Sequence, residues 1–290
     1  MCVTSLRLID PASILSMCAL YFNPYKGVSL MKLIHYLAPI IIGMLLVAGC
    51  SEKDDSSPTS SNTPGTLRLL ITDAPAQYDE VFVSFSEVSV HFEDQWITVS
   101  DSVQTYDLLE LSNSITAVLG TKTLSPGNYG QIRLKTIDDS TRVVIGGESF
   151  PLKVPSGSSS GLKLGGGFEI VSGVTTELVL DFDAARSIHE KGHKEEFTMN
   201  PVIRIVATLQ SGSISGHVTN VENAPVAYAI AGTDSMTTFV DMTNGDFILG
   251  FLPPATYNVT VTDSLDRSFS TDNITVTIGQ SEDIGDITLQ

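Results

Sequence analysis

The segment LRLLITDAPAQYDEVFVSFSEVSVHF, residues 67–92, carries the clearest folding signal in the sequence. Apolar side chains alternate with others at Leu67, Leu69 and Ile71, and a second run with the same period begins at Val81. Because successive side chains of a β-strand point to opposite faces, this alternation predicts two strands, each with one buried face. The DAPAQYD between the two runs has the proline and aspartates that are typical of turns.

The same pattern continues along most of the remaining chain. Short apolar runs are separated by PGN at 126–128, GG at 146–147 and PSG at 155–157, which are turn sequences. Only residues 106–119 suggest a short helix, and strands nowhere alternate with long helices. We therefore expect an all-β chain with two antiparallel β-sandwich domains, Ig-like or prealbumin-like, at residues 66–209 and 212–290.

The charge of the chain excludes one class of partner. The 290 residues have a formal net charge of −17, and 42% of them are hydrophobic. Without residues 1–49 the net charge becomes −19, because that segment contains three basic residues and one acidic residue. A chain this acidic repels phosphate backbones, so nucleic acid is not expected as a partner. The composition otherwise fits a globular protein with an aliphatic core.

Residues 31–50, MKLIHYLAPIIIGMLLVAGC, have the organisation of an export signal that ends in a cysteine. Lys32 provides the positive start, and the apolar run up to Val47 is too short to span a membrane as a helix. The closing Val-Ala-Gly-Cys resembles the lipobox of bacterial lipoproteins. This resemblance implies cleavage between Gly49 and Cys50, removal of residues 31–49 as a signal peptide, and lipid on the sulfur of Cys50.

The residues on either side of this signal complete the prediction. Residues 1–30 do not fit an export signal, so we expect translation to start at Met31; an unusually long leader is the alternative. Residues 50–65 are polar and rich in serine, proline and aspartate, which predicts a flexible tether. Ser51 is not the aspartate that retains lipoproteins in the inner membrane, so an outer-membrane location is expected. Lys53-Asp54-Asp55 resembles an export signal to the cell surface.

A series of motifs between residues 66 and 207 resembles a family of bacterial lipoprotein domains known only as domain of unknown function 4382. The family brings no assigned chemistry with it. The motifs are LITDAP (70–75), YDEVFV (78–83), DLLEL (107–111), GNYGQIRL (127–134), LDFDA (180–184) and MNPVIR (199–204).

The C-terminal residues 212–290 resemble a different module. GDFIL at 245–249 and LPPATYNVTV at 252–261 are similar to the carboxypeptidase regulatory-like module, a small sandwich of the transthyretin or prealbumin type. Ala255 stands where that family usually has glycine. The resemblance implies a β-sandwich and no peptidase activity.

Three aspartates form the candidate metal site. Asp181 and Asp183 alternate with apolar residues, so on a strand their carboxylates face the same side. Together with Asp73, or with Asp138 and Asp139, they would supply oxygen ligands of the kind that calcium prefers. The same pair would also suit the acid and base of a glycosidase if a cleft lay beside it. The alternative is that these aspartates cap turns or lie on a polar face. We expect no other cofactor.

These observations leave three hypotheses for function. The first is a non-catalytic binding or adhesion module of the cell envelope, with an unknown protein or glycan as ligand and the lipid membrane as partner through Cys50. The second is a structural or assembly spacer, and the third is a hydrolase of unrecognised type. No nucleophile elbow or phosphate-binding loop is present in the sequence, so the first hypothesis is preferred.

Overall fold

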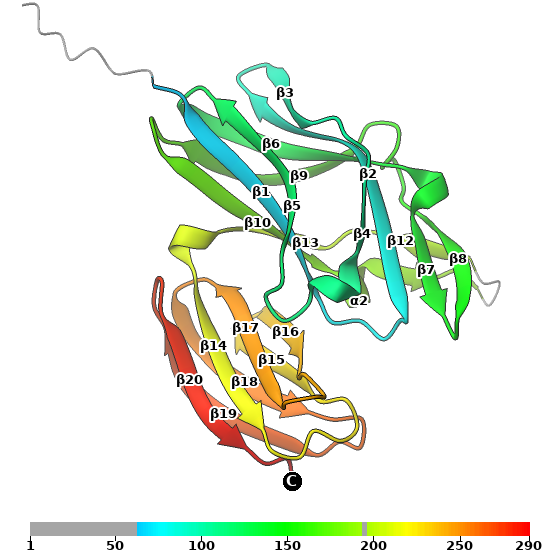
Figure 1. Ribbon diagram of the computed structural model, residues 1–290, viewed down its shortest axis with the longest axis vertical. Helices are drawn as coiled ribbons and strands as arrows, with labels where there is room; N and C mark the ends of the chain where they lie inside the picture. The colour runs from blue at the N-terminus through cyan, green and yellow to red at the C-terminus, as the bar shows by residue number, and fades with distance from the viewer. Residues whose placement is uncertain (1–62, 193–195) are drawn as a thin grey trace, which may run out of the picture. The chain divides into compact units, whose positions relative to one another are not determined.

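The computed structural model describes residues 63–192 and 196–290, which belong to one compact unit, Thr59–Gln290. Two hydrophobic cores lie in this unit (Figure 1). Buried residues of the first core fall between Leu67 and Met199, and those of the second fall between Ile214 and Leu289. No helix within the described ranges is long and apolar enough to cross a membrane. We call the parts around these cores the first and the second sandwich.

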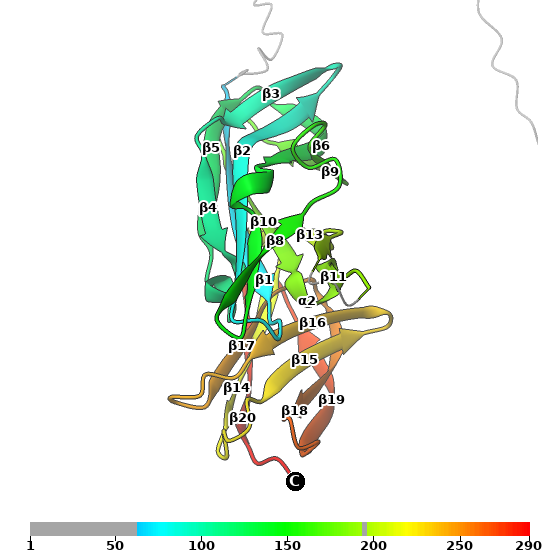
Figure 2. The same cartoon turned by 90° about the vertical axis from the view of Figure 1, so that its right-hand side faces the viewer.

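The first sandwich consists of a four-stranded and a nine-stranded sheet. Its elements are β1 (Gly65–Ala74), β2 (Glu80–Phe92), β3 (Gln95–Ser100), β4 (Gln104–Asp107), η2 (Leu108–Leu111), β5 (Ala117–Leu124), β6 (Gly127–Thr136), η3 (Asp138–Ser140), β7 (Arg142–Ile145), β8 (Glu148–Lys153), β9 (Leu162–Ile170), β10 (Thr175–Asp183), α2 (Ala184–Ser187), β11 (Ile188–Glu190), β12 (Phe197–Met199), β13 (Ile203–Ala207) and η4 (Thr208–Gln210). The four-stranded sheet has the order β13-β10-β1-β5. The other has the order β11-β12-β8-β7-β2-β6-β9, and β3 and β4 also pair with β2 (Figure 2).

The alternate apolar side chains of β1 are buried, as their period of two in the sequence predicts. Leu67, Leu69 and Ile71 are completely buried and face the first core. In the neighbouring strand β10, Leu178 lies opposite Leu69 and Leu180 lies opposite Ile71. Full burial of a side chain of this size stabilises the fold by about 1.5–3 kcal/mol. These strands confirm the predicted all-β fold class.

The pairing of β1 with β10 is parallel, whereas the sequence analysis predicts antiparallel sheets. The register runs from Thr66 opposite Thr175 to Ala74 opposite Asp183. Parallel neighbours cannot be joined by a hairpin and need a long connection. Here the connection contains β5, which joins the same sheet, and β2 to β4 and β6 to β9, which build most of the other sheet of the sandwich. The pairs β8–β12 and β14–β20 are also parallel, and the other pairs are antiparallel.

The segment 106–119 contains less helix than its sequence suggests. It forms the single turn η2 and then enters β5. Asp107 caps this turn, because its Oδ1 accepts a hydrogen bond from the backbone N–H of Leu109 at 3.2 Å. Leu108 and Leu111 are buried in the first core. The apolar residues of this segment therefore fill the core from one helical turn and do not extend the helix.

The second sandwich is smaller and pairs a three-stranded with a four-stranded sheet. Its strands are β14 (Gly212–Val218), β15 (Val226–Ala231), β16 (Asp234–Phe239), β17 (Asp246–Leu252), β18 (Ala255–Thr262), β19 (Ser268–Val276) and β20 (Ser281–Ile287). The sheet orders are β17-β14-β20 and β16-β15-β18-β19. Phe247 and Val259 are completely buried between the sheets. Tyr257 is also buried, and its hydroxyl donates to the carbonyl of Pro253 at 2.9 Å.

Candidate binding groove and the predicted aspartate site

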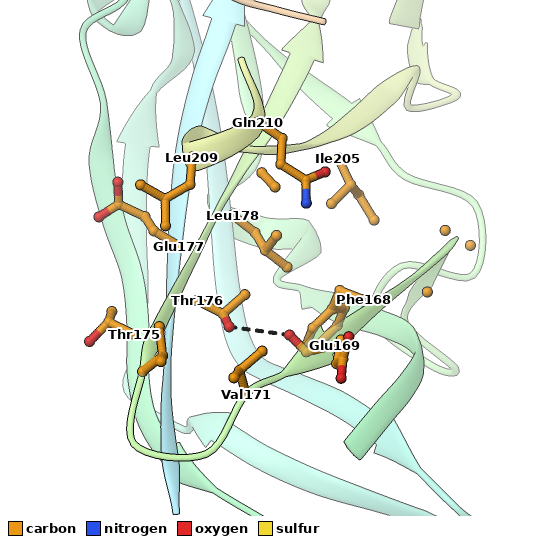
Figure 3. A pocket seen from close by; sticks show the side chains of 15 residues that line it. Phe168, Glu169, Val171, Thr175, Thr176, Glu177, Leu178, Ile205, Leu209 and Gln210 are labelled. Carbon is orange, nitrogen blue, oxygen red and sulfur yellow. Dashed lines mark hydrogen bonds between the residues drawn. The ribbon is translucent and has the colours of Figure 1, made fainter. Parts of the chain in front are cut away.

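A groove lies on the side of the first sandwich where β9 and β13 are the last strands of their sheets (Figure 3). Its volume is about 530 Å³. The second half of β9, the turn that follows it, the start of β10 and the end of β13 form its walls. The apolar side chains that line it are Phe168, Val171, Val174, Leu178, Ile205, Ala207 and Leu209.

A stack of aromatic rings holds one wall of the groove in place. The ring of Phe168 stacks on Tyr129 with centroids 5.3 Å apart and an angle of 13° between the planes. Tyr129 stacks in turn on Phe92 at 4.6 Å. The hydroxyl of Tyr129 donates to the carbonyl of Ser125 at 3.0 Å, which fixes the middle ring. Aromatic stacks are stabilising beyond their buried area, so these contacts hold the ring of Phe168 against Tyr129.

Several apolar side chains at the groove remain in contact with solvent. Leu209 is 71% exposed, and Val171 and Val174 are also exposed. Figure 3 shows Leu178 in the middle of the groove, with Leu209 and Ile205 on one side of it and Val171 on the other. Single exposed apolar residues are common, but a group around one concave site is typical of a binding surface.

Three consecutive glycines, Gly165 to Gly167, form part of the groove wall. The pairing of β9 with β6 is irregular here, since Phe168 lies opposite Tyr129 and Gly165 lies opposite Gln131. Gly166 has φ of +107°, a conformation that side chains other than glycine rarely adopt. A glycine bulge in a strand often marks a place where another backbone or a ligand approaches closely.

The polar groups of the groove are few and partly neutralised. The Thr176 hydroxyl donates to the backbone carbonyl of Glu169 at 3.2 Å, as the dashed line in Figure 3 marks. Glu177 pairs with Arg68 at 2.6 Å, whereas the exposed Glu169 forms no ion pair within the described part of the chain. The described lining contains no histidine, cysteine or lysine. The groove therefore presents an apolar floor with one uncompensated negative charge.

The structure places Asp73 and Asp181 on opposite faces of the four-stranded sheet. Side chains of residues in register on neighbouring strands point to the same face of a sheet. Asp73 lies in register with Phe182, which is part of the first core. Asp181 lies in register with Thr72 on one side and Arg204 on the other, so it faces the opposite way.

The calcium site expected from Asp73, Asp181 and Asp183 is therefore not formed. Asp181 already has a cation beside it, since Arg204 Nη2 donates to its Oδ2 at 2.8 Å. Asp183 caps α2 by accepting from the backbone N–H of Arg186 at 2.9 Å. Within residues 63–192 and 196–290 there is no group of three or more histidine, cysteine, aspartate or glutamate side chains that could hold a metal ion.

Two of these aspartates have perturbed titration. Burial raises the pKa of Asp73 well above its usual range, the backbone N–H of Ala184 opposes this shift, and the charges of Asp181 and Asp183 add to it. Asp73 Oδ1 accepts from Ala184 at 3.0 Å, while the buried Oδ2 has no partner among the described residues. Burial also raises the pKa of Asp181, and the Arg204 guanidinium limits this rise. Both carboxyls favour the protonated form more than an exposed aspartate does.

The remaining predicted site residues, Gly49 and Cys50, lie outside the described residues. The sequence analysis does not predict the groove, and it assigns no role to Gly165 to Gly167. A signal was present, because a run of glycines inside an apolar strand pattern indicates a bulge or a close backbone approach.

A comparison with protein families supports the first resemblance. Residues 64–201 match the family described as "Domain of unknown function (DUF4382)". This match confirms the similarity that the motifs of residues 66–207 indicate. The resemblance of residues 212–290 to the carboxypeptidase regulatory-like module stays a prediction. No curated protein matches the chain.

Several solved structures are similar to the chain at low identity. The TIE protein of Bacillus anthracis is similar over 78% of this chain and 34% of its own length, with 14% identity and a TM-score of 0.22. A fimbrial protein of Bacteroides ovatus is similar over 78% of this chain and 50% of its own, with 9% identity and a TM-score of 0.22. The minor pilin GBS52 of Streptococcus agalactiae is similar over 77% of this chain and 94% of its own length, with 9% identity and a TM-score of 0.18.

The chain thus spans about a third of the TIE protein and half of the fimbrial protein. Because all three TM-scores are below 0.5, we draw no conclusion about function from these likenesses.

Proposed function

We propose that this chain is an exported lipoprotein of the bacterial cell envelope, anchored by acyl chains on Cys50, and that its first sandwich is a non-catalytic module. In this proposal the module binds a protein or a glycan in the groove between β9 and β13. An outer-membrane location and exposure at the cell surface complete the proposal. They rest on Ser51 and on Lys53-Asp54-Asp55.

The anchor is supported by the sequence around Cys50. Small residues at positions 48 and 49 give a signal peptidase access to the backbone, and the cysteine sulfur accepts the lipid. Each buried methylene of an acyl chain then contributes about 0.8 kcal/mol to membrane binding. Residues 51–64, which separate Cys50 from β1, reach roughly 50 Å at most when extended. The tether therefore allows the sandwiches to stand clear of the lipid surface.

The observation that carries the binding function is the groove itself. Concave apolar sites with a few polar groups are the usual form of a ligand site. Its two carboxylates, Glu169 and Glu177, have no imidazole or thiol beside them in the described lining, and Glu177 is neutralised by Arg68. Catalysis by general acid and base needs positioned groups with matched titration, and this lining does not offer such a pair. We therefore favour binding over hydrolysis.

The anchor is tested by replacing the lipidated sulfur. Labelled palmitate should appear on the wild-type protein and be absent from Cys50→Ser, which should accumulate as an unprocessed or soluble species. Membrane fractionation of the same cells gives an independent readout. Equal labelling of both proteins would refute the lipid anchor.

The binding function is tested with a soluble form that begins at Ser51. This form is applied to glycan arrays and to immobilised envelope proteins, beside the variants Leu209→Ser and Val103→Ser. The two side chains are 71% and 69% exposed, but only Leu209 lines the groove. We expect a retained ligand that is lost with Leu209→Ser and kept with Val103→Ser. Conversion of the ligand to a product would refute a non-catalytic role.

A further inference from the structure

We infer that the groove binds an extended segment of another polypeptide, which lies as an added strand along the free edge of β9. The incoming segment has apolar side chains at alternate positions and a basic residue near one end. This inference rests on the proposed function, because it assigns the ligand class of the same groove. It is carried by three features of the described residues: free strand edges, an uncovered apolar floor, and one unpaired charge.

Both strands that border the groove have a free edge. Among the described residues β9 pairs only with β6, and β13 pairs only with β10. An edge strand presents unpaired backbone N–H and C=O groups, which are a template for another strand. Addition of a peptide strand to such an edge is a common mode of peptide recognition. The β9 edge thus offers main-chain hydrogen-bonding groups on one side of the groove, apart from the Glu169 carbonyl, which accepts from Thr176.

The floor of the groove is the face of β10 and β13 that turns toward the core. Ile205 and Ala207 alternate along β13 and lie opposite Leu180 and Leu178 of β10. Both residues pack against the first core, yet both remain partly exposed. The sheet that contains β9 ends at this point, so it does not cover them. One additional strand beside β9 would cover Ile205, Ala207 and Leu209 and would continue the sandwich.

The glycines of β9 permit a close approach of this added backbone. A Cβ atom at Gly165 would meet no atom within 4 Å, and one at Gly166 would meet only Ile205, at 3.8 Å. A Cβ at Gly167 would instead meet the carbonyl oxygen of Tyr129 at 3.0 Å, so the open space lies over Gly165 and Gly166 alone. Because β13 has five residues, we expect an incoming segment of similar length to match it.

The charges favour a different polypeptide over a second copy of this chain. The exposed Glu169 is the one lining carboxylate without an ion pair among the described residues, since Arg68 neutralises Glu177. A lysine or arginine of the incoming segment would form an ion pair with the Glu169 carboxylate. Two copies of a chain with net charge −17 repel each other, so self-association is disfavoured.

The probe is a peptide selected from a displayed library of random linear peptides with the soluble form that begins at Ser51. Enriched peptides should alternate β-branched or other apolar residues with polar ones and contain lysine or arginine. Leu209→Ser should bind the selected peptide at least about tenfold more weakly than the wild type does, because the variant loses one leucine contact that the peptide would bury. Val103→Ser, equally exposed but outside the groove, should bind as the wild type does.

Two further measurements test the mode of binding. Two versions of the selected peptide are made, one with its odd-numbered and one with its even-numbered backbone amides N-methylated. Only one version should lose binding, because only one of the two sets of amides pairs with the β9 edge. Glu169→Gln should weaken binding about threefold at low salt and much less at high salt. Glu148→Gln, which changes an exposed carboxylate of β8 outside the groove, should have no effect.

The outcomes separate this inference from the proposed function. Peptides without alternation, or binding that both N-methylated versions retain, would overturn the strand model. So would concentration-dependent self-association that Leu209→Ser abolishes, because the occupant would then be a second copy. A glycan retained by the wild type and lost with Leu209→Ser would refute the peptide and leave the proposed function intact. Failure to enrich any ligand of either class would overturn both.

Discussion

Removal of the Arg204 side chain is the sharpest test of the charged pair in the four-stranded sheet. Arg204 Nη2 lies 2.8 Å from Asp181 Oδ2, and the two side chains are 32% and 10% exposed. Arg204→Met keeps most of the aliphatic stem and removes the charge. Asp181 is then left in the sheet with no cation beside it, and its carboxylate has lost the hydrogen bond that offsets its burial.

The expected loss of unfolding free energy follows from the exposed fractions of the two side chains. Removing one partner of a fully buried pair costs about 3–5 kcal/mol. Because solvent screens a third of Arg204, we expect about 2–3 kcal/mol of lost unfolding free energy at pH 8. For a domain of this size the melting temperature falls by about 2–4 °C per kcal/mol, which gives a drop of about 4–12 °C. Arg68→Met is the control, since its pair with Glu177 is more exposed and is expected to contribute at most about 1 kcal/mol.

The effect should depend on pH in a defined direction. Burial raises the pKa of Asp181 above 3.8, and removal of Arg204 raises it further. A carboxyl with a raised pKa in the folded state contributes stability that is complete below pH 3.8 and is lost as the pH rises through the folded pKa. Arg204→Met should therefore be less destabilising at pH 5 than at pH 8.

Denaturant unfolding of the soluble form at both pH values measures this difference. The double variant Arg204→Met with Asp181→Asn should recover most of the lost stability, because it removes the uncompensated charge. An equal loss at pH 5 and pH 8, or no recovery in the double variant, would refute the interpretation.

Four further predictions can be tested separately. Asp73→Asn keeps an acceptor for Ala184 and should flatten the loss of unfolding free energy that we expect of the wild type as the pH rises above 3.8; an unchanged pH profile would contradict the assigned burial effect. Translation from Met31 should give a protein that is exported and labelled with palmitate as well as the full reading frame, and loss of export would show that residues 1–30 are a genuine leader. Alanine at positions 53–55 should protect the protein from protease added to intact cells, whereas protection of the wild type would place it on the periplasmic side. Residues 211–290 contain no lysine, so their intact mass should equal the sequence mass without an isopeptide cross-link.

The strands of the first sandwich could be predicted because their alternation is local. Leu67, Leu69 and Ile71 show period two in the sequence and are fully buried in β1. The parallel register of β1 with β10 could not be predicted in the same way, since neither strand contains a signal for its distant partner. That register decides that Asp73 and Asp181 face opposite ways. The expected calcium site failed for this reason.

The groove was hidden from the sequence for a related reason. The groove contains residues of the types that usually fill a core, namely Leu178, Ile205 and Leu209. The sequence around each of them does not indicate which ones stay exposed. Their exposure depends on where the sheet with β9 ends relative to the sheet with β13. The glycines of β9 were the one local sign, and their meaning depends on the position of β9 at an edge.

The parallel pairing of β1 with β10 also determines when the first sandwich can fold. Arg68 and Glu177, which pair directly, are 109 residues apart. At about 5–20 residues per second of synthesis, β10 leaves the ribosome roughly 5–20 seconds after β1. Folds dominated by such distant pairings also fold slowly, in milliseconds to seconds. Throughout this interval β1 lacks its parallel neighbour, so the core of the first sandwich cannot close until β10 has been made.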